Sequence, residues 1–554
     1  MQNNEASTSV DTDVSETMHS IVAGRELEGQ GGTTRAVDPA TGAETGPEFT
    51  LLSSEQLVSA TSAAEEAFDS YRKATPQQIS DLLTAIAEQI ENRGEDIVAT
   101  AMTETGLPQA RLQGELARTT NQLRLFANVA LRGDHLGVRI EPALPERSPL
   151  PRPDLRQKRI PLGPVGVFGA SNFPLAFSVA GGDTASALAS GCPVVVKAHN
   201  AHPGTGHLVG EAVSAAVADQ DVHPGVFSLV YGRGADIGQE LVADPRIRAV
   251  GFTGSRSGGT ALMATAAARP VPIPVYAEMS SVNPVFVLPS AIAEGSTAEE
   301  LAKGFVTSLN GSAGQLCTAP GLIFVPTGNA GDEFVDCVAA EVATATGQTM
   351  LTPGICEART QGADRLATSA GVNEVGRGTE GQTANAPAPA VFSTDVARFV
   401  GTPELSDEVF GAVCLIVRHD SDEELLSAAK NLVGELTATI HLSESDSADL
   451  ERAAALAELL EQRVGRILFN GWPTGVDVGD AMVHGGPYPA TSDGRSTSVG
   501  TAAIERFLRP VVFQNAPAPV LSAAIRDENP WSLTRRVDGV VTLADSAGDG
   551  GSDV

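Results

Sequence analysis

The chain has 554 residues, of which 42% are hydrophobic, and this length is sufficient for two or three domains with buried cores. Its 68 acidic and 37 basic residues give a net charge of −31. Such a surface repels nucleic acid and anionic membranes, so neither is expected as a partner, and no run of about 18 apolar residues predicts a membrane span.

The chain begins with a polar, acidic stretch, residues 1–20, which is predicted to be disordered. This stretch contains no Lys, no Arg and no apolar run, so it predicts no secretory signal. Residues 543–554 have a similar composition and are also predicted to be disordered. A cytoplasmic location is expected, in which the five cysteines would be free thiols. The cysteines show no zinc-ligand spacing, and no metal is predicted.

Helical periodicity dominates the next part of the chain. Apolar residues recur at helical spacing in two segments between about Ser54 and Arg93, with a short loop between them. A third helix is expected from about Pro108 to Ala130, and it carries several polar and basic side chains, among them Arg118.

Alternating strands and helices follow. Residues 164–169 and 194–198 are short, Val-rich and bounded by Gly or Pro, as is typical of buried parallel strands. Residues 182–190 between them predict a helix. Four further elements are expected: helix 205–219, strand 226–230, helix 235–243 and strand 248–252. This alternation predicts a doubly wound α/β domain.

A second α/β run is predicted from about Asn283. It includes the apolar segments VFVLP, GLIFVP and ATIHLS, and a helix from about Glu423 to Leu432. Residues 370–390 are rich in Gly, Ala and polar residues and are predicted to form a surface loop.

Cys317 in GQLCTAP is a candidate nucleophile. A lone cysteine is weak evidence, because most buried free cysteines only pack. A loop that passes into a helix is expected here, and a helix N-terminus would lower the thiol pKa. A thiolate is a suitable nucleophile for a carbonyl carbon.

Three other features indicate catalytic or binding roles when they are considered together with Cys317. Glu278 lies between apolar segments, and the expected desolvation would raise its pKa toward that of a general base, although a salt-bridged or loop carboxylate is favoured when Glu278 is considered alone. Asn172 closely follows a strand, where its amide could stabilise an oxyanion or merely form a turn. The Gly-rich turn 251–259 could bind phosphate or only connect two elements.

Together and in this order, these features resemble the aldehyde dehydrogenase superfamily. The resemblance covers roughly residues 21–542. The matching motifs include Asn172-Phe173-Pro174, Lys197, Phe252-Thr253-Gly254-Ser255, Glu278, Gly314-Gln315-Leu316-Cys317-Thr318 and Glu408-Val409-Phe410-Gly411. The resemblance implies that Cys317 attacks the aldehyde, that Asn172 and the Cys317 N–H hold the oxyanion, and that Glu278 activates water. The implied cofactor contacts are Lys197 and Glu408 to the riboses, Gly254 and Ser255 to the pyrophosphate, and Phe410 near the nicotinamide.

The resemblance also implies a domain plan. It comprises a Rossmann-type cofactor-binding domain (21–130 and 160–280), an α/β catalytic domain (281–483), a small oligomerisation arm with a substrate-side loop (131–159 and 484–515), and a C-terminal extension (516–542). A homodimer or homotetramer built through the arm is expected.

One departure from the common family pattern narrows the resemblance. Met279-Ser280-Ser281 stand where the family usually has Leu and two glycines after the catalytic Glu. This variant looks like a branch that oxidises 2,5-dioxopentanoate (α-ketoglutaric semialdehyde) to 2-oxoglutarate, with medium- and long-chain fatty aldehyde dehydrogenases as relatives. A substrate carboxylate needs a basic partner, and Arg118 and Arg495 are the candidates, although either could instead form an ion pair. His484 is expected to line the substrate side.

The expected cofactor is NADP⁺, with NAD⁺ tolerated. Many NAD-preferring members carry a Glu three residues after the strand lysine, whereas this chain has Asn200, which imposes no like-charge penalty on a 2′-phosphate. Lys197 could pair with that phosphate, and Arg233 could hold the adenine end.

Two other readings remain. Acylation of coenzyme A is disfavoured because acylating relatives generally lack the water-activating Glu. A catalytically silent binding protein is disfavoured because Cys317, Glu278 and Asn172 occur together.

Overall fold

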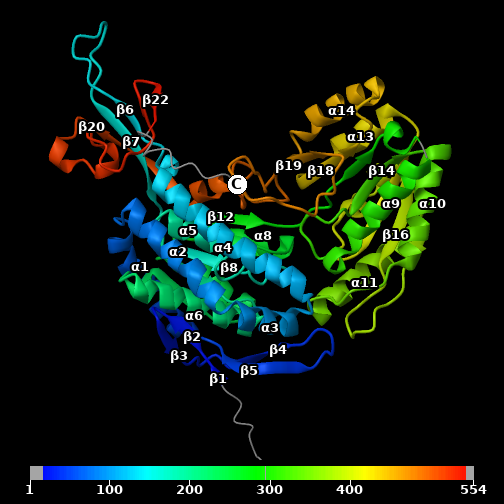
Figure 1. Cartoon of the computed structure of the whole chain (residues 1–554), viewed down its shortest axis with the longest axis horizontal. Helices are drawn as coiled ribbons and strands as arrows, with labels where there is room; N and C mark the ends of the chain where they lie inside the picture. The colour runs from blue at the N-terminus through cyan, green and yellow to red at the C-terminus, as the bar shows by residue number, and fades with distance from the viewer. Residues whose placement is uncertain (1–16, 294, 544–554) are drawn as a thin grey trace, which may run out of the picture.

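The computed structural model describes residues 17–293 and 295–543. Two large β-sheets, each covered by helices on both faces, form two α/β modules, and a third sheet projects from the first module (Figure 1). The α/β fold predicted from the sequence is thus confirmed.

The first sheet has the strand order β12-β11-β8-β9-β10-β2-β3. It is parallel from β12 to β10, and β2 and β3 extend it in antiparallel pairing. The strands are β2 (Ser20–Val22), β3 (Arg25–Leu27), β8 (Val165–Phe168), β9 (Val194–Lys197), β10 (Phe227–Val230), β11 (Ala249–Thr253) and β12 (Val275–Glu278). The central strands β8, β9 and β10 are completely buried, which explains their continuous apolar sequence.

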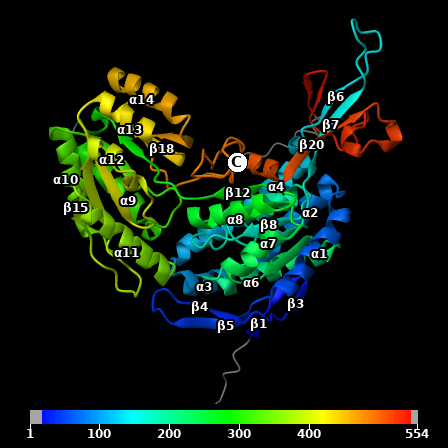
Figure 2. The same cartoon turned by 180° about the vertical axis from the view of Figure 1, so that it is seen from behind.

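Helices cover both faces of this sheet. Side chains of α2, α4, α5 and α6 pack on one face, and those of α7, α8 and the first half of α1 pack on the other. Figure 2 shows α7 and α8 on the side of the sheet that faces the viewer from behind. The helices are α1 (Ser54–Tyr71), α2 (Pro76–Asn92), α3 (Gly94–Thr105), α4 (Gln109–Arg132), α5 (Gly182–Ala189), α6 (Pro203–Asp219), α7 (Gln239–Ala243) and α8 (Arg256–Ala268). Capping boxes begin α1 and α2. The sequence analysis did not predict α3.

The second sheet has the order β15-β16-β17-β14-β13-β18-β19 and is parallel apart from β15. Its strands are β13 (Val285–Val287), β14 (Leu322–Pro326), β15 (Asn373–Arg377), β16 (Ala390–Asp395), β17 (Val413–His419), β18 (Glu435–His441) and β19 (Val464–Phe469). Its helices are α9 (Gly295–Asn310), α10 (Asn329–Thr344), α11 (Pro353–Thr368), α12 (Val396–Gly401), α13 (Asp422–Asn431) and α14 (Ser447–Leu460). Strand β15 corrects the prediction that residues 370–390 form only a loop.

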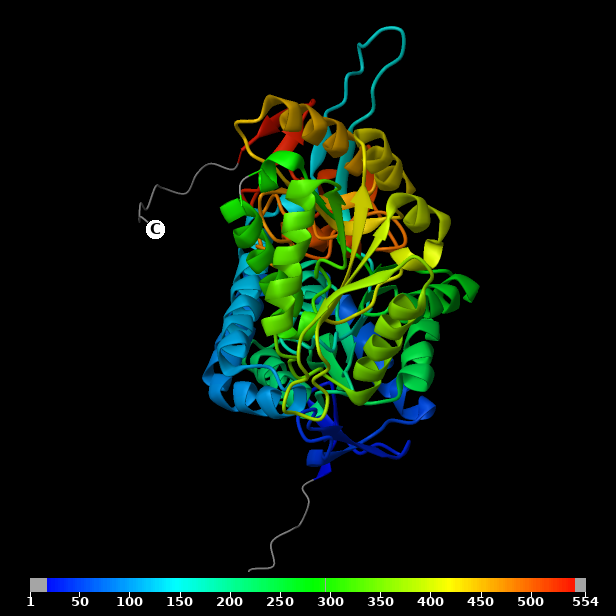
Figure 3. The same ribbon diagram turned by 90° about the vertical axis from the view of Figure 1, so that its right-hand side faces the viewer.

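The third sheet, which we call the arm, has the order β20-β7-β6-β21-β22. Its strands are β6 (Arg139–Glu141), β7 (Leu155–Pro161), β20 (Leu508–Gln514), β21 (Arg535–Val537) and β22 (Val540–Thr542). Strands β7 and β20 pair over seven residues, from Leu155 opposite Gln514 to Pro161 opposite Leu508. The predicted extension 516–542 therefore contributes two strands to the arm. The loop between β6 and β7 extends away from the body of the molecule (Figure 3).

A small sheet, β1-β5-β4, lies at the opposite end from the arm (Figure 1). Its strands are β1 (Thr17–Met18), β4 (Thr33–Val37) and β5 (Glu44–Thr50). The prediction of disorder was wrong for residues 17–20, because β1 pairs with β5 and β2 pairs with β10. Residues 1–16 and 544–554 of the predicted tails lie outside the described residues. Across the described ranges, no helix is both long and apolar enough to cross a membrane.

Candidate active site

A cavity of about 680 Å³ lies where the carboxyl ends of the first-sheet strands meet the second module. Sites in open α/β folds commonly occupy this position. Eight of the residues singled out from the sequence line it: Asn172, Lys197, Gly254, Ser255, Glu278, Cys317, Glu408 and Phe410. Residues more than 200 positions apart therefore meet in one cavity.

Cys317 lies in a turn rather than at a helix N-terminus. A short 3-10 helix, Gly311–Gly314, precedes the turn, and β14 follows it. The expectation that a helix dipole activates this thiol was wrong, because Ser312 and Ala313 adopt left-handed φ angles of 54° and 59° and redirect the chain.

Two contacts fix the Cys317 turn. Gly314 has a φ of 69°, and a Cβ at this position would lie 2.3 Å from the backbone of Gly411, so only glycine fits. The Asn283 amide donates to the carbonyl oxygens of Cys317 at 2.9 Å and Ala319 at 3.0 Å. Cys317 is thus held by backbone packing on one side and an amide on the other.

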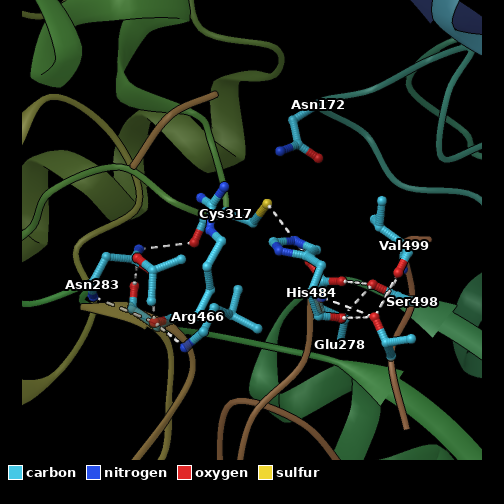
Figure 4. Close-up of polar contacts among 12 residues, drawn as sticks. Asn172, Glu278, Asn283, Cys317, Arg466, His484, Ser498 and Val499 are labelled. Atoms are coloured by element: carbon cyan, nitrogen blue, oxygen red, sulfur yellow. Dashed lines mark hydrogen bonds and ion pairs between the residues drawn. The ribbon is translucent and has the colours of Figure 1, made fainter. Parts of the chain in front are cut away.

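His484 connects Cys317 with Glu278. Its Nε2 atom lies 3.5 Å from Cys317 Sγ and 2.9 Å from Glu278 Oε1 (Figure 4). Ser498 donates a hydrogen bond to the other carboxylate oxygen of Glu278. His484 and Glu278 are 1% and 3% exposed, so solvent screens this pair very little.

The segment from His484 to Ser498 is held against β12. Thr491 forms a β-bridge with Glu278, and Ser492 N donates to Ala277 O at 3.0 Å. The Thr497 hydroxyl accepts from the backbone N–H of His484 at 2.8 Å. Because Glu278 ends β12, this local pairing places the imidazole beside the carboxylate.

The charges of the site differ from the sequence expectation. Burial alone raises the pKa of Glu278, but the His484 ring and the Ser498 hydroxyl together lower it below its ordinary value. The expected raised pKa of Glu278 is therefore corrected. Burial, and then Glu278, raise the pKa of the Cys317 thiol well above its ordinary value. Cys317 is thus a thiol at neutral pH, and His484 Nε2 and the Glu278 carboxylate are the basic groups beside it.

Asn172 points toward Cys317 in Figure 4. Its amide nitrogen donates one hydrogen bond, to Gln315 O at 3.0 Å, which leaves its second N–H for a ligand. Within residues 17–293 and 295–543, the backbone N–H of Cys317 has no hydrogen-bond partner. Two N–H groups arranged in this way can both donate to one oxyanion.

Helix α4 holds the Asn172 loop. Arg111 donates to Asn172 O at 2.7 Å, and buried Glu115 accepts from the N–H groups of Leu175 and Ala176 at 2.9 and 3.0 Å. Arg111 and Glu115 lie 3.7 Å apart. These contacts fix the loop at both ends, and the sequence analysis did not assign Arg111 or Glu115 a role.

Most of the residues predicted to contact the cofactor line the cavity, whereas Arg233 lies elsewhere. Lys197 is buried, which lowers its pKa to about 8, and its ammonium donates to Asn200 Oδ1 at 2.9 Å. Burial raises the pKa of Glu408 to about 7. Ser255 caps α8, and both it and Gly254 line the cavity. Arg233 is exposed and lines a separate depression next to α1 and α7.

A nicotinamide cofactor fits these residues. Lys197 is a buried cation with no carboxylate partner among the described residues, and the α8 N-terminus opens at Ser255. An anionic ligand in this part of the cavity satisfies both.

Three guanidinium groups surround Cys317 on the side of α4 and β19. Arg111 and Arg118 stack on the rings of Phe173 and Phe177, with centroid distances of 4.9 and 5.4 Å. The third guanidinium belongs to Arg466 on β19. Burial lowers the pKa of all three arginines, and the charge of a Cys317 thiolate would raise it.

Arg118 and Arg495 are in opposite situations. Arg118 has two buried guanidinium nitrogens, Nε and Nη2, without a hydrogen-bond partner in the part of the chain that the structure describes. The Arg495 side chain is 92% exposed and pairs with Asp493 at 3.1 Å. Its selection as a substrate residue is corrected, because it is already paired at the surface.

Comparison with known proteins defines the class. Residues 27–510 match the model of the aldehyde dehydrogenase family. The match covers most of the chain, so the protein belongs to this family and is an NAD(P)-dependent aldehyde dehydrogenase.

Two curated relatives and two solved structures refine the comparison. The chain is 48% identical to "Alpha-ketoglutaric semialdehyde dehydrogenase 2" of Azospirillum brasilense, with 94% of this chain and 98% of the relative covered. It is also 48% identical to "Alpha-ketoglutaric semialdehyde dehydrogenase" of Acinetobacter baylyi, with 90% and 94% covered. The fold is shared with Escherichia coli lactaldehyde dehydrogenase (TM-score 0.76, 23% identity, 90% and 99% covered). It is also shared with Pseudomonas syringae aldehyde dehydrogenase C in complex with NAD⁺ and octanal (TM-score 0.75, 21% identity, 92% and 99% covered).

Proposed function

We propose that this enzyme oxidises 2,5-dioxopentanoate to 2-oxoglutarate. The observation that carries the proposal is the Arg118 guanidinium near Cys317, which has two buried nitrogens without a partner. A half-buried cation whose guanidinium has two nitrogens without a partner among the described residues is matched by an aldehyde with a carboxylate at its far end. The names of the two relatives at 48% identity support the same substrate.

In the proposed mechanism, the neutral His484 ring carries its hydrogen on Nδ1 and accepts the Cys317 proton at Nε2. The resulting imidazolium then donates from Nε2 to the Glu278 carboxylate, which stabilises it. The thiolate adds to the aldehyde carbon. The Asn172 amide and the Cys317 N–H donate to the oxyanion that forms. A bound nicotinamide cofactor supplies the two-electron acceptor that converts this adduct into a thioester on Cys317.

Release of the acid needs an activated water. Glu278 carries a lowered pKa and is therefore ionised at neutral pH, so it is available as the base. Ser498 and His484 orient its two oxygens. Attack of the water on the thioester carbon expels the Cys317 thiolate and yields the carboxylate.

The proposed cofactor preference is NADP⁺ over NAD⁺. Lys197 supplies a buried positive charge, and its partner Asn200 is a neutral amide, so no carboxylate at this position opposes a 2′-phosphate. A clearly higher kcat/KM with NAD⁺ than with NADP⁺ would contradict this assignment.

A panel of aldehydes tests the substrate. We expect the highest kcat/KM with 2,5-dioxopentanoate and a lower value with hexanal, which lacks the carboxylate. Arg118→Ala should raise KM for 2,5-dioxopentanoate much more than for hexanal. Arg495→Ala is the matched control, because it removes an equal charge from the surface, and it should leave both KM values unchanged. Equal loss with both aldehydes in Arg118→Ala would refute the role of Arg118 and favour a fatty aldehyde as substrate.

The proposed assembly is a homodimer or homotetramer formed through the arm. Val512 on β20 and Val540 and Val541 on β22 are more than half exposed on this sheet. Light scattering of the purified protein measures the subunit number, and a monomer at micromolar concentration would contradict the proposal.

A further inference from the structure

Three side chains of the catalytic cluster have the donor set of a transition-metal site. Cys317 offers a thiolate sulfur, His484 an imidazole nitrogen and Glu278 a carboxylate oxygen, and these atoms all lie within 4.8 Å of one another. Three protein ligands with sulfur, nitrogen or oxygen donors are typical of zinc sites that keep a fourth coordination position open. The geometry points to an inhibitory site, in which a zinc ion binds Cys317, His484 and Glu278 together and blocks catalysis reversibly.

Two of the three distances between the donor atoms are close to those around a tetrahedral ion, and the third, from Cys317 Sγ to the Glu278 oxygen, is at most 4.8 Å. Zinc binds sulfur at about 2.3 Å and nitrogen or oxygen at about 2.0–2.1 Å, so two ligand atoms of a tetrahedron lie roughly 3.3–3.6 Å apart. The distance from His484 Nε2 to Cys317 Sγ is 3.5 Å. The 2.9 Å between His484 Nε2 and Glu278 Oε1 needs to increase by only a few tenths of an ångström.

The surroundings also suit an ion. The Ser498 hydroxyl holds the Glu278 oxygen that would not bind the metal, as an outer-shell partner does. The cavity beside Cys317 provides the entry path and room for a fourth ligand. His484 Nδ1 is buried and has no hydrogen-bond partner within the described residues, so the affinity should be below that of structural zinc sites.

Zinc binding would block the proposed roles of all three residues at once. The ion would occupy the Cys317 Sγ lone pair proposed to attack the aldehyde, the His484 Nε2 position proposed to accept the proton and one oxygen of the carboxylate proposed to activate water. A divalent cation also compensates two negative charges that the apo site must bring close together, the thiolate and the Glu278 carboxylate. Metal binding at these residues does not depend on which aldehyde is the substrate.

The test uses the full-length Cys337→Ser/Cys356→Ser protein, which lacks the two other partly exposed thiols. In a competition titration with a chromophoric chelator, one zinc per chain should bind, activity should be lost in parallel, and EDTA should restore it. Zinc should also protect Cys317 from iodoacetamide. Cobalt should bind with a thiolate-to-metal charge-transfer band in the near ultraviolet, which reports the sulfur ligand independently of activity.

Ligand variants in the same background locate the site. Cys317→Ser and His484→Gln should each weaken zinc binding by at least about 100-fold, with an unchanged far-ultraviolet circular dichroism spectrum. Cys317→Ser decides the question if His484→Gln does not fold. Equal zinc affinity in Cys317→Ser, or a cobalt complex without the charge-transfer band, would overturn the proposal and leave only an adventitious surface ion. Failure with 2,5-dioxopentanoate as substrate would leave this result unaffected.

Discussion

Replacing His484 with Gln should slow the attack of Cys317 in a strongly pH-dependent way. A cysteine of ordinary pKa near 8.5 is only about 3% thiolate at pH 7. Burial and Glu278 raise the pKa of Cys317 further, so the thiolate is scarcer still. In the proposed mechanism, His484 Nε2, 3.5 Å from the sulfur, compensates by accepting the proton. A general base of this kind contributes about 10²–10⁴-fold.

The assay is the pre-steady-state burst of NAD(P)H with 2,5-dioxopentanoate. At pH 7, His484→Gln should lower the burst rate at least about 100-fold. The deficit should then shrink by up to about tenfold for each pH unit, because the variant depends on thiolate formed by the solvent and its rate follows the ionised fraction below the raised pKa. The wild-type burst should depend much less on pH.

Ser498→Ala is the matched control for this prediction. Ser498 belongs to the same buried cluster but contacts Glu278 instead of Cys317. Removal of the Ser498 hydroxyl should leave the burst rate unchanged and lower only the steady-state rate, because the steady state includes hydrolysis of the thioester. If the His484→Gln deficit stays constant from pH 7 to 9, the imidazole does not act as the base for Cys317 and our reasoning is wrong.

Three further variants test other parts of the site. Glu278→Gln should give one burst of NAD(P)H per active site and then stall as a thioester, seen as a mass increase on Cys317, and sustained turnover would identify a different base. Glu115→Ala leaves the N–H groups of Leu175 and Ala176 buried without a partner, at a cost of about 1–3 kcal/mol each. Glu115→Ala should lower Tm and the burst rate much more than Glu115→Gln, which retains an oxygen. A full burst rate in Glu115→Ala would show that the contacts of Glu115 with Leu175 and Ala176 do not position Asn172. Asn200→Glu places a carboxylate near the proposed 2′-phosphate, so kcat/KM should fall at least about tenfold with NADP⁺ but not with NAD⁺, and parallel changes would contradict the NADP⁺ assignment.

Local patterns predicted much of the fold. The Val-rich segments became β8, β9 and β10, because strands buried on both faces require continuous apolar sequence. Strand β15 was missed for the opposite reason: it lies at a sheet edge, most of its side chains are half or fully exposed, and its sequence NEVGR contains one apolar side chain. An edge strand that is stabilised mainly by backbone hydrogen bonds produces only a weak pattern of apolar residues in the sequence.

The candidate site was predictable in its members but not in its electrostatics. Motifs were sufficient to select Cys317, Glu278 and Asn172. Glu278 and His484 are 206 residues apart in sequence, so the contact that lowers the pKa of Glu278 arises only from the tertiary fold. The turn around Cys317 depends on left-handed φ angles at non-glycine residues, which propensities do not anticipate. Arg495 was selected by its charge alone, and only the structure reveals its ion pair with Asp493.

The pairing of β7 with β20 has a consequence for biosynthesis. A ribosome makes residues 155–161 about 350 positions before their partner strand, 508–514, so β7 must wait with an open edge while the intervening modules fold. His484 and Ser498 also emerge during this late interval. An unfinished chain therefore carries the proposed nucleophile but not its proposed base, and the complete site forms together with the closure of the arm.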